Sequence, residues 1–293
     1  MKEIVAVDPS LTGAAWSLAQ AEEREIQGIV EELACTPQLA RCLAIRGRRT
    51  PLRPGLGALP DPNDLPALEE VARRLTKIAQ DRAPLRLVAA TDAEGSAASL
   101  LLSAALKRVG SGPLVLDLPG SWEQAERLQP EAVQRCAETG QRHLLSLAPS
   151  SREARDRAHT LGIELLEGLG EGLDPGTAAL LLSRSLLDSH PSRELLLRSL
   201  LKLAALALLA GRHGTWTPRS RAILRMGLDE LNRERHSPGL AALLQSAGTH
   251  PGTLRSAELA EALVPRLDGL GRPDLALLLR ELMESGDASQ ARE

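Results

Sequence analysis

Two acidic residues, Asp92 and Glu94, stand in the segment TDAEG directly after the apolar stretch 85–90. Such a stretch predicts a buried strand, and open α/β sheets carry their active sites at the carboxyl ends of parallel strands. The pair is therefore a candidate active site. The alternative is a capping turn, in which Asp92 accepts hydrogen bonds from backbone N–H groups of a following helix.

The residues after this acidic pair predict the start of a helix. Gly95 and Ser96 are small, and the segment 97–108 has the apolar pattern of a helix. The free N–H groups and the dipole at a helix N-terminus attract anions, so Gly95 and Ser96 are candidates for contacting a phosphate. Plain N-capping is the equally weighted alternative.

Strands and helices alternate around this point. We expect strands at 85–90, 113–118, 143–147 and 163–166, with helices at 67–81, 97–108, 121–139 and 151–161. This order implies an α/β fold with a doubly wound, mainly parallel sheet. Residues 21–46 predict a helical N-terminal lead-in that breaks at Thr36-Pro37. From Pro175 onward the pattern is helical, which predicts an all-helical C-terminal part.

Composition limits the kinds of partner. The formal net charge of −3 excludes a broadly basic surface, and the absence of Phe and Tyr counts against base stacking on an aromatic platform. The three cysteines form no CxxC pair and indicate buried thiols in a reducing compartment. No apolar run reaches membrane-spanning length and no signal peptide is recognisable, so we expect a cytoplasmic protein without a membrane partner.

A Pro-, Gly- and Arg-rich segment, 46–66, predicts an extended crossing between the N-terminal helices and the sheet. Its arginines Arg46, Arg48 and Arg49 are candidates for phosphate contacts. A solvated arginine-rich loop explains the same residues equally well.

Six segments in order resemble the DHH phosphoesterase superfamily and, within it, the RecJ-type single-strand DNA exonucleases. ELACTPQLARCLAIRG resembles the helical lead-in of RecJ, TDAEGSAASLLLSAALKRVG the first metal motif, and LVLDLPGSWEQA the next strand-end Asp motif. LDPGTAALLLSRSLL, SRAILRMGLDEL and VPRLDGLGRPDLALLL are similar to three later motifs of the family. Their order and spacing make the resemblance stronger than any one motif.

The resemblance implies a dinuclear Mn²⁺ or Mg²⁺ centre built from carboxylates, with Asp92, Glu94 and Asp117 as its ligands here. Four motifs depart from the family pattern, one of them the GT segment AGRHGTWTPRSR, which contains no Asp. Glu94 stands where Asp is usual, the DHH triplet falls on Leu147-Ala148-Pro149, and Asp268 replaces the customary Asn. Two metal ions need more carboxylate or imidazole ligands than remain, with His143 and His213 only as distant candidates. We therefore expect no catalytic residues and no metal cofactor.

The resemblance also implies further phosphate-facing positions. His213 lies in the loop GRHG, and Arg266 and Arg272 lie in the last motif. We expect nucleic-acid or inter-element contacts for the two arginines. An exposed loop residue is the simpler interpretation of His213, and surface arginines are the competing interpretation of the other two.

These observations predict three parts: a lead-in and crossing segment at 1–66, a DHH-like α/β domain at 67–190, and a helical part at 191–293 that completes the core. We expect no second DHH-associated lobe. The leading hypothesis is a catalytically inactive binding or scaffold subunit in DNA replication or repair, which holds single-stranded DNA, a replication or repair protein, or both. The alternative is a divergent phosphodiesterase or single-strand DNA exonuclease that uses Mn²⁺ or Mg²⁺ through Asp92, Glu94 and Asp117.

Overall fold

A computed structural model describes residues 4–7, 16–47, 55–90, 92–117, 127–167, 173–211, 216–233, 235–265 and 281–282. The chain divides into two compact units, residues 1–54 and residues 55–293, which are described separately. The three-part division expected from the sequence stays a prediction.

The smaller unit pairs a two-stranded antiparallel ribbon with two helices. Its elements are β1 (Ile4–Val7), β2 (Trp16–Ala19), α1 (Glu23–Leu33) and α2 (Pro37–Ile45). The predicted break at Thr36-Pro37 is confirmed: the Thr36 hydroxyl accepts a hydrogen bond from the N–H of Leu39 at 3.4 Å, and Pro37 occupies the first helical turn. Ile26, Ile29, Ala40 and Ala44 form the buried core of this unit.

The larger unit contains a parallel sheet of four strands. They are β3 (Leu85–Val88), β4 (Leu114–Asp117), β5 (His143–Ser146) and β6 (Glu164–Glu167), in the order β4-β3-β5-β6. The predicted α/β class with a parallel sheet is confirmed. Val88 is in register with both Asp117 and Ser146, so the carboxyl ends of β4, β3 and β5 lie along one edge of the sheet.

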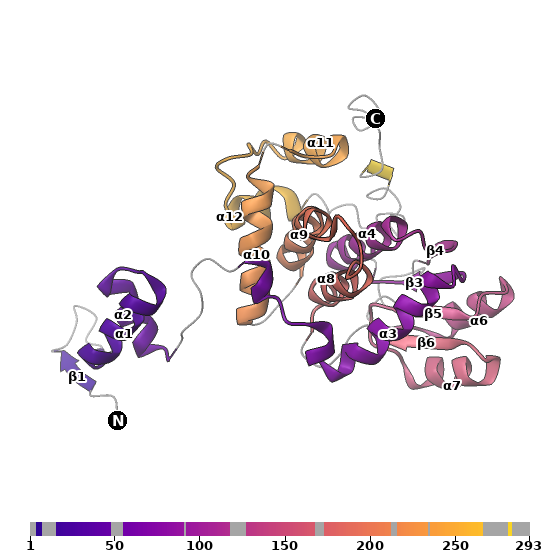
Figure 1. The fold of residues 1–293 in the computed structure, drawn as a ribbon, viewed down its shortest axis with the longest axis horizontal. Helices are drawn as coiled ribbons and strands as arrows, with labels where there is room; N and C mark the ends of the chain where they lie inside the picture. The colour runs from indigo at the N-terminus through magenta and orange to yellow at the C-terminus, as the bar shows by residue number, and fades with distance from the viewer. Residues whose placement is uncertain are drawn as a thin grey trace. The chain divides into compact units, whose positions relative to one another are not determined.

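Helices cover the sheet and continue beyond it (Figure 1). They are η1 (Leu56–Ala58), η2 (Pro62–Asp64), α3 (Pro66–Gln80), α4 (Ala93–Arg108), α6 (Pro130–Glu138), α7 (Arg152–Leu161), α8 (Pro175–Leu186), α9 (Arg193–Ala210), α10 (Pro218–Leu231), α11 (Pro238–Ser246), α12 (Ser256–Glu258) and η3 (Leu259–Leu263). No helix among these described elements is long and apolar enough to cross a membrane.

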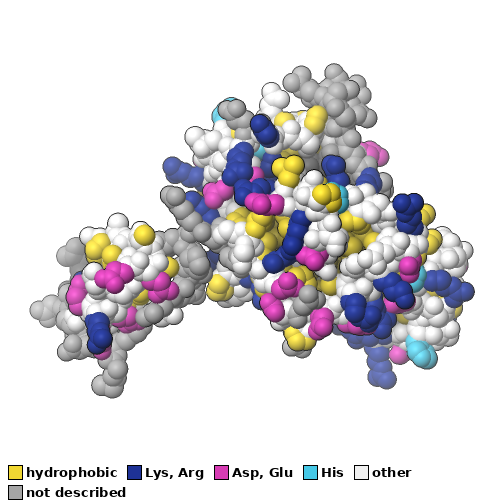
Figure 2. Space-filling model, viewed as in Figure 1, with side chains coloured by type: hydrophobic (Ala, Val, Ile, Leu, Met, Phe, Trp, Pro, Cys, Tyr) yellow, Lys and Arg dark blue, Asp and Glu magenta, His cyan; other side chains and the backbone are white. Residues whose placement is uncertain are grey.

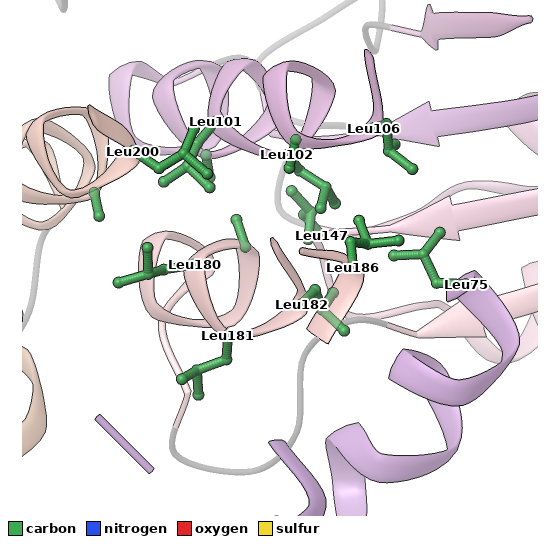
Figure 3. Packing of buried hydrophobic residues seen from close by; sticks show 14 of the residues in the cluster. Leu75, Leu101, Leu102, Leu106, Leu147, Leu180, Leu181, Leu182, Leu186 and Leu200 are labelled. Carbon is green, nitrogen blue, oxygen red and sulfur yellow. The ribbon is translucent and has the colours of Figure 1, made fainter. Parts of the chain in front are cut away.

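The side-chain alternation of the strands sorts the helices onto two faces. Leu87 and Leu145 pack in the main core with α3, α4, α8 and α9, whereas Val88 and Leu144 pack with α6 and α7. Because Phe and Tyr are absent, leucines fill the main core, as Figure 3 shows between α4 and α8. This two-face burial is what the near-continuous apolar strands predict for a parallel sheet.

The strand order distinguishes the β3–β5 pair from the other strand pairs. The chain leaves β3 through α4 toward β4, returns past β3 to β5 through α6, and leaves β5 through α7 toward β6. Connections therefore depart from β3 and β5 in opposite directions, which defines the topological switch point of the sheet. The residues that follow β3 and β5 flank this switch point, the place at which open α/β sheets carry a ligand crevice.

Candidate functional site at the carboxyl edge of the sheet

Asp92 is the N-cap of α4. Its Oδ1 accepts a hydrogen bond from the N–H of Gly95 at 2.7 Å. The helix begins at Ala93, earlier than the expected start at 97, so TDAEG leads directly into the first helical turn rather than forming a free loop. Glu94 lies within that turn and is only 7% exposed. The capping interpretation describes the geometry of Asp92, and its role toward metal or phosphate stays a prediction.

Gly95 brings the first turn of α4 into contact with the end of the strand. A Cβ atom at this position would lie 2.4 Å from the carbonyl oxygen of Ala90, which is far inside van der Waals contact. Only glycine permits this approach. This close packing fixes the position of the N-terminus of α4 relative to the segment that follows β3.

Replacing Gly95 with alanine is expected to lower the free energy of unfolding by about 1–3 kcal/mol, because the backbone of Ala90 must shift to admit the methyl group. Urea unfolding followed by circular dichroism measures the change. Gly57→Ala is the matched control in the same unit, since no heavy atom lies within 4 Å of its Cβ position. Equal stability of the two variants would show that the backbone at Ala90 shifts without a measurable cost in free energy.

Helices α4, α8 and α10 begin near the last turn of α9. Asp174 caps α8 by accepting from the N–H of Thr177 at 2.6 Å, and Thr217 caps α10 by accepting from the N–H of Ser220 at 3.0 Å. The Ser220 hydroxyl also donates to Asp174 Oδ2 at 3.4 Å, which joins the two caps. The last turn of α9 touches both the start of α4, through Ala210 and Ala93, and the start of α8. The positive dipole ends of α4, α8 and α10 favour an anion here, whereas the C-terminus of α9 and the capping carboxylates Asp92 and Asp174 oppose one.

Asp117, the third predicted acid, is bound by two arginines. Its Oδ2 accepts from Arg86 Nη1 at 2.9 Å and from Arg135 Nε at 3.2 Å, and its Oδ1 accepts from Arg135 Nη2 at 3.2 Å. Arg135 belongs to α6, so the carboxylate points toward the α6–α7 face of the sheet. Helix α4, with Asp92 and Glu94, covers the opposite face. The structure therefore does not bring Asp117 together with the other two acids on one face.

Arg86 completes a closed polar network on that face. Arg86 Nε donates to Gln141 Oε1 at 2.7 Å and its Nη2 donates to the Thr139 hydroxyl at 3.0 Å. Arg86 itself is 5% exposed, so three neighbours compensate a guanidinium that has lost its water. Burial raises the pKa of the adjacent Cys136 thiol, which keeps it protonated and inert.

Apolar residues occupy the other side of the switch point. Leu147, Ala148 and Pro149 follow β5, and the N–H of Leu147 donates to the carbonyl of Val88 at 2.8 Å. Leu147 is 1% exposed and belongs to the main leucine core; Figure 3 shows it on the side where α4 and α8 pack. This segment offers no side-chain oxygen or nitrogen to a ligand.

The donors that the described residues supply at this edge do not fit a two-metal centre. Such a centre needs several carboxylate or imidazole ligands around ions about 3.5–4 Å apart. Among the described residues, no group of three or more His, Cys, Asp or Glu side chains has a metal-binding arrangement. His143, one of the distant candidates, begins β5 at the opposite edge of the sheet and contacts Glu164 Oε2 through Nδ1 at 2.8 Å.

The remaining candidates fall elsewhere. Arg46 follows α2 in the smaller unit and is exposed. The other phosphate-contact candidates, Arg48, Arg49, His213, Arg266 and Arg272, lie outside the described residues. Their roles stay predictions.

The sequence interpretation missed Arg86 and Arg135, which decide the surroundings of Asp117. Arg86 did carry a signal, because it is a charged residue inside the apolar stretch LRLVAA and must find a buried partner there. Arg135 carried no such signal, because arginines at positions expected to be exposed are frequent on the helices of this chain.

The sheet defines a class: a parallel α/β domain with a topological switch point between β3 and β5. Comparison with known proteins is more specific. No protein-family model matches the chain. The chain is 26% identical over 294 residues to the single-stranded-DNA-specific exonuclease RecJ of Dickeya dadantii (strain 3937), covering 87% of this chain and 50% of that protein.

Solved structures agree with this similarity. RecJ of Thermus thermophilus in complex with Mn²⁺ superposes with a TM-score of 0.72 at 20% identity, covering 94% of this chain and 43% of that one. The exonuclease RecJ bound to manganese gives a TM-score of 0.62 at 20% identity, covering 76% and 62%. The Thermus RecJ with Mg²⁺ gives 0.65 at 19% identity, covering 94% and 40%.

The resemblance to RecJ, first seen in the motifs, is thereby confirmed: the chain is similar to a RecJ protein in sequence and resembles the RecJ structures in fold. The chain spans half the length of the curated RecJ that it matches. The activity of the whole RecJ protein therefore does not transfer directly to this chain.

Proposed function

We propose that this RecJ-like chain is a catalytically inactive binding subunit of DNA replication or repair. It would hold single-stranded DNA, a replication or repair protein, or both, at the carboxyl edge of its sheet. The observation that carries the proposal is the state of Asp117, whose two oxygens accept hydrogen bonds from Arg86 and Arg135. A carboxylate already neutralised by two guanidinium groups is a poor ligand for a divalent cation.

Two further observations support loss of the centre. Asp92 has Oδ1 engaged in capping α4, and the segment after β5 is apolar at Leu147 and Ala148. Hydrolysis of a phosphodiester by two metal ions needs ligands on several sides of the ions. The described part of this edge supplies too few.

Binding without hydrolysis has its own support in three helix N-termini. Helices α4, α8 and α10 begin near this edge with positive dipole ends, which favour a phosphate group once it displaces or bypasses the capping side chains Asp92, Asp174 and Thr217. On the visible face of the larger unit, Lys and Arg side chains are interspersed with acidic ones (Figure 2), so binding would be local rather than spread over a basic field.

A second candidate, a divergent Mn²⁺- or Mg²⁺-dependent single-strand exonuclease or oligonucleotide phosphoesterase, is favoured by the similarity to RecJ structures that contain Mn²⁺ or Mg²⁺. It would use Asp92, Glu94 and Asp117. This function requires Asp117 to exchange its hydrogen bonds with Arg86 and Arg135 for a cation. It also requires Asp92 to give up its hydrogen bond with the N–H of Gly95.

One assay separates the two functions. Single-stranded DNA labelled at the 5′ end is incubated with the full chain and Mn²⁺, and wild type is compared with Asp92→Ala. We expect no release of label above that of the variant, together with salt-dependent retention of the wild type on immobilised single-stranded DNA. Hydrolysis that disappears in Asp92→Ala overturns the inactive-subunit proposal.

Protein binding is tested in parallel. Capture of a known replication or repair protein by the wild type, without turnover of DNA, supports the scaffold role. Absence of both DNA retention and such a partner contradicts the proposed function as a whole.

A further inference from the structure

A cavity of about 520 Å³ lies between α4, α9 and the segment that leads into α11. Helix α4 reaches this cavity from its middle to its C-terminus, through Leu100, Ala104 and Arg108. A rise of 1.5 Å per residue places Ala104 roughly 18 Å along the helix from the Asp92 cap. The cavity is therefore separate from the carboxyl edge of the sheet.

The cavity has an apolar floor and a cationic rim. Four buried leucines form the floor: Leu100, Leu200, Leu203 and Leu240. Four basic residues line the rest: Lys107, Arg108, Lys202 and Arg235. Ser199 and Ser237 add hydroxyl groups, and no Asp or Glu is among the lining residues. The walls are thus amphipathic, and their charge is of one sign.

Lys202 is the built-in polar element of this cavity. The residue is only 8% exposed, and its Nζ donates to the carbonyl of Arg235 and lies 3.3 Å from His236 Nδ1. Among the described residues it forms no ion pair with a carboxylate. The nearby Glu230 is taken by Arg198 at 3.2 Å and Arg233 at 3.0 Å. Burial lowers the pKa of Lys202, as expected for a buried ammonium group without a matching anion.

We propose that this cavity binds a small amphipathic anion: an unbranched aliphatic chain that carries a carboxylate or phosphate group. The chain would lie on the leucine floor, and the anionic group would contact Lys202 and the arginines at the rim. The volume is within the range of about 300–1,000 Å³ typical of small-molecule sites. Planar bases are disfavoured, because the lining has no aromatic side chain on which a base could stack.

Titration calorimetry of the full chain with dodecanoate and with dodecyl phosphate, each below its critical micelle concentration, tests this site and distinguishes the two head groups. We expect one molecule bound per chain with micromolar affinity for at least one of them. Dodecyltrimethylammonium, which has the same chain and the opposite charge, is expected to bind at least tenfold more weakly. Free inorganic phosphate, which lacks the chain, is expected to bind equally poorly.

Variants tie the binding to the cavity. Arg108→Glu reverses an exposed charge at the rim and is expected to weaken the anion at least tenfold. Arg152→Glu makes the same change on α7, where the side chain is 90% exposed, and is expected to bind like wild type. Lys202→Met tests the buried contact, and a circular dichroism melt shows whether it folds.

Three results overturn the proposal: no binding of either anion up to about 1 mM, equal binding of the cationic surfactant, or equal affinity of wild type and Arg108→Glu. None of these results bears on the DNA assay above, because the two sites share no residue.

Discussion

Replacing Arg86 with methionine is expected to lower the free energy of unfolding by about 3–5 kcal/mol, the usual cost of removing one partner from a buried ion pair. The change leaves Asp117 with only Arg135, whose side chain is 44% exposed. It also removes the shorter of the two hydrogen bonds that Gln141 Oε1 accepts, the other coming from the Thr139 hydroxyl. Methionine is close in length to the lost side chain, so the loss reports the unpaired carboxylate more than a cavity. Urea unfolding measures it directly.

Matched variants separate the charge from the packing. Arg135→Met is expected to cost less than about 1 kcal/mol, because a partly exposed ion pair is screened by water. The double variant Arg86→Met with Asp117→Leu is expected to recover most of the stability, since no buried charge is left unpaired. If Arg86→Met is as stable as wild type, Asp117 has another means of neutralisation, and the argument from its arginines fails.

Replacing Leu147 with aspartate is expected to lower the free energy of unfolding by about 4 kcal/mol or more. The substitution removes a buried leucine from the main core and places a carboxyl group in its apolar environment. The position is one at which the family resemblance places a metal ligand. The experiment therefore tests whether a carboxylate introduced at position 147 binds a divalent cation.

Thermal melts with and without 1 mM Mn²⁺ (roughly 100 times a 10 µM Kd, an effect of about 2.7 kcal/mol) give the answer. We expect Mn²⁺ to leave the melting temperature of Leu147→Asp unchanged, because Asp117 remains bound to its arginines. Leu147→Met, which keeps the apolar volume, is the control and is expected to cost less than about 1.5 kcal/mol. Specific stabilisation of the aspartate variant by Mn²⁺ would mean that the metal site is one residue short, and that the divergent-nuclease function is the better proposal.

Much of the fold can be predicted from the local sequence. The apolar stretches at 85–90 and 143–147 are buried on both faces, so they read as continuous strands, and Thr36-Pro37 marks a helix start by its own chemistry. The start of α4 was misplaced because Gly95 is ordinarily a poor helix residue. Its presence in the first turn depends on contact with Ala90, which no local pattern contains.

The site was less predictable, because its decisive contacts are long-range. Asp117 was placed correctly at the end of a strand, but its environment depends on the parallel register that sets Val88 beside Asp117. That register puts Arg86, two residues earlier on the same face, within reach of the carboxylate. Without pairing information, Asp117 looks the same whether it faces a cation or a guanidinium group.

The paired arginines also restrict how this sequence can change over evolutionary time. Exchange of Arg86 or Asp117 alone leaves a buried charge without its counterpart, so either single step passes through a less stable protein, whereas the joint exchange does not. Arg86 and Asp117 thus form a coupled pair in sequence space, in which each constrains the substitutions open to the other. A substitution of Arg86 that freed Asp117 for another partner would therefore pass through a less stable intermediate.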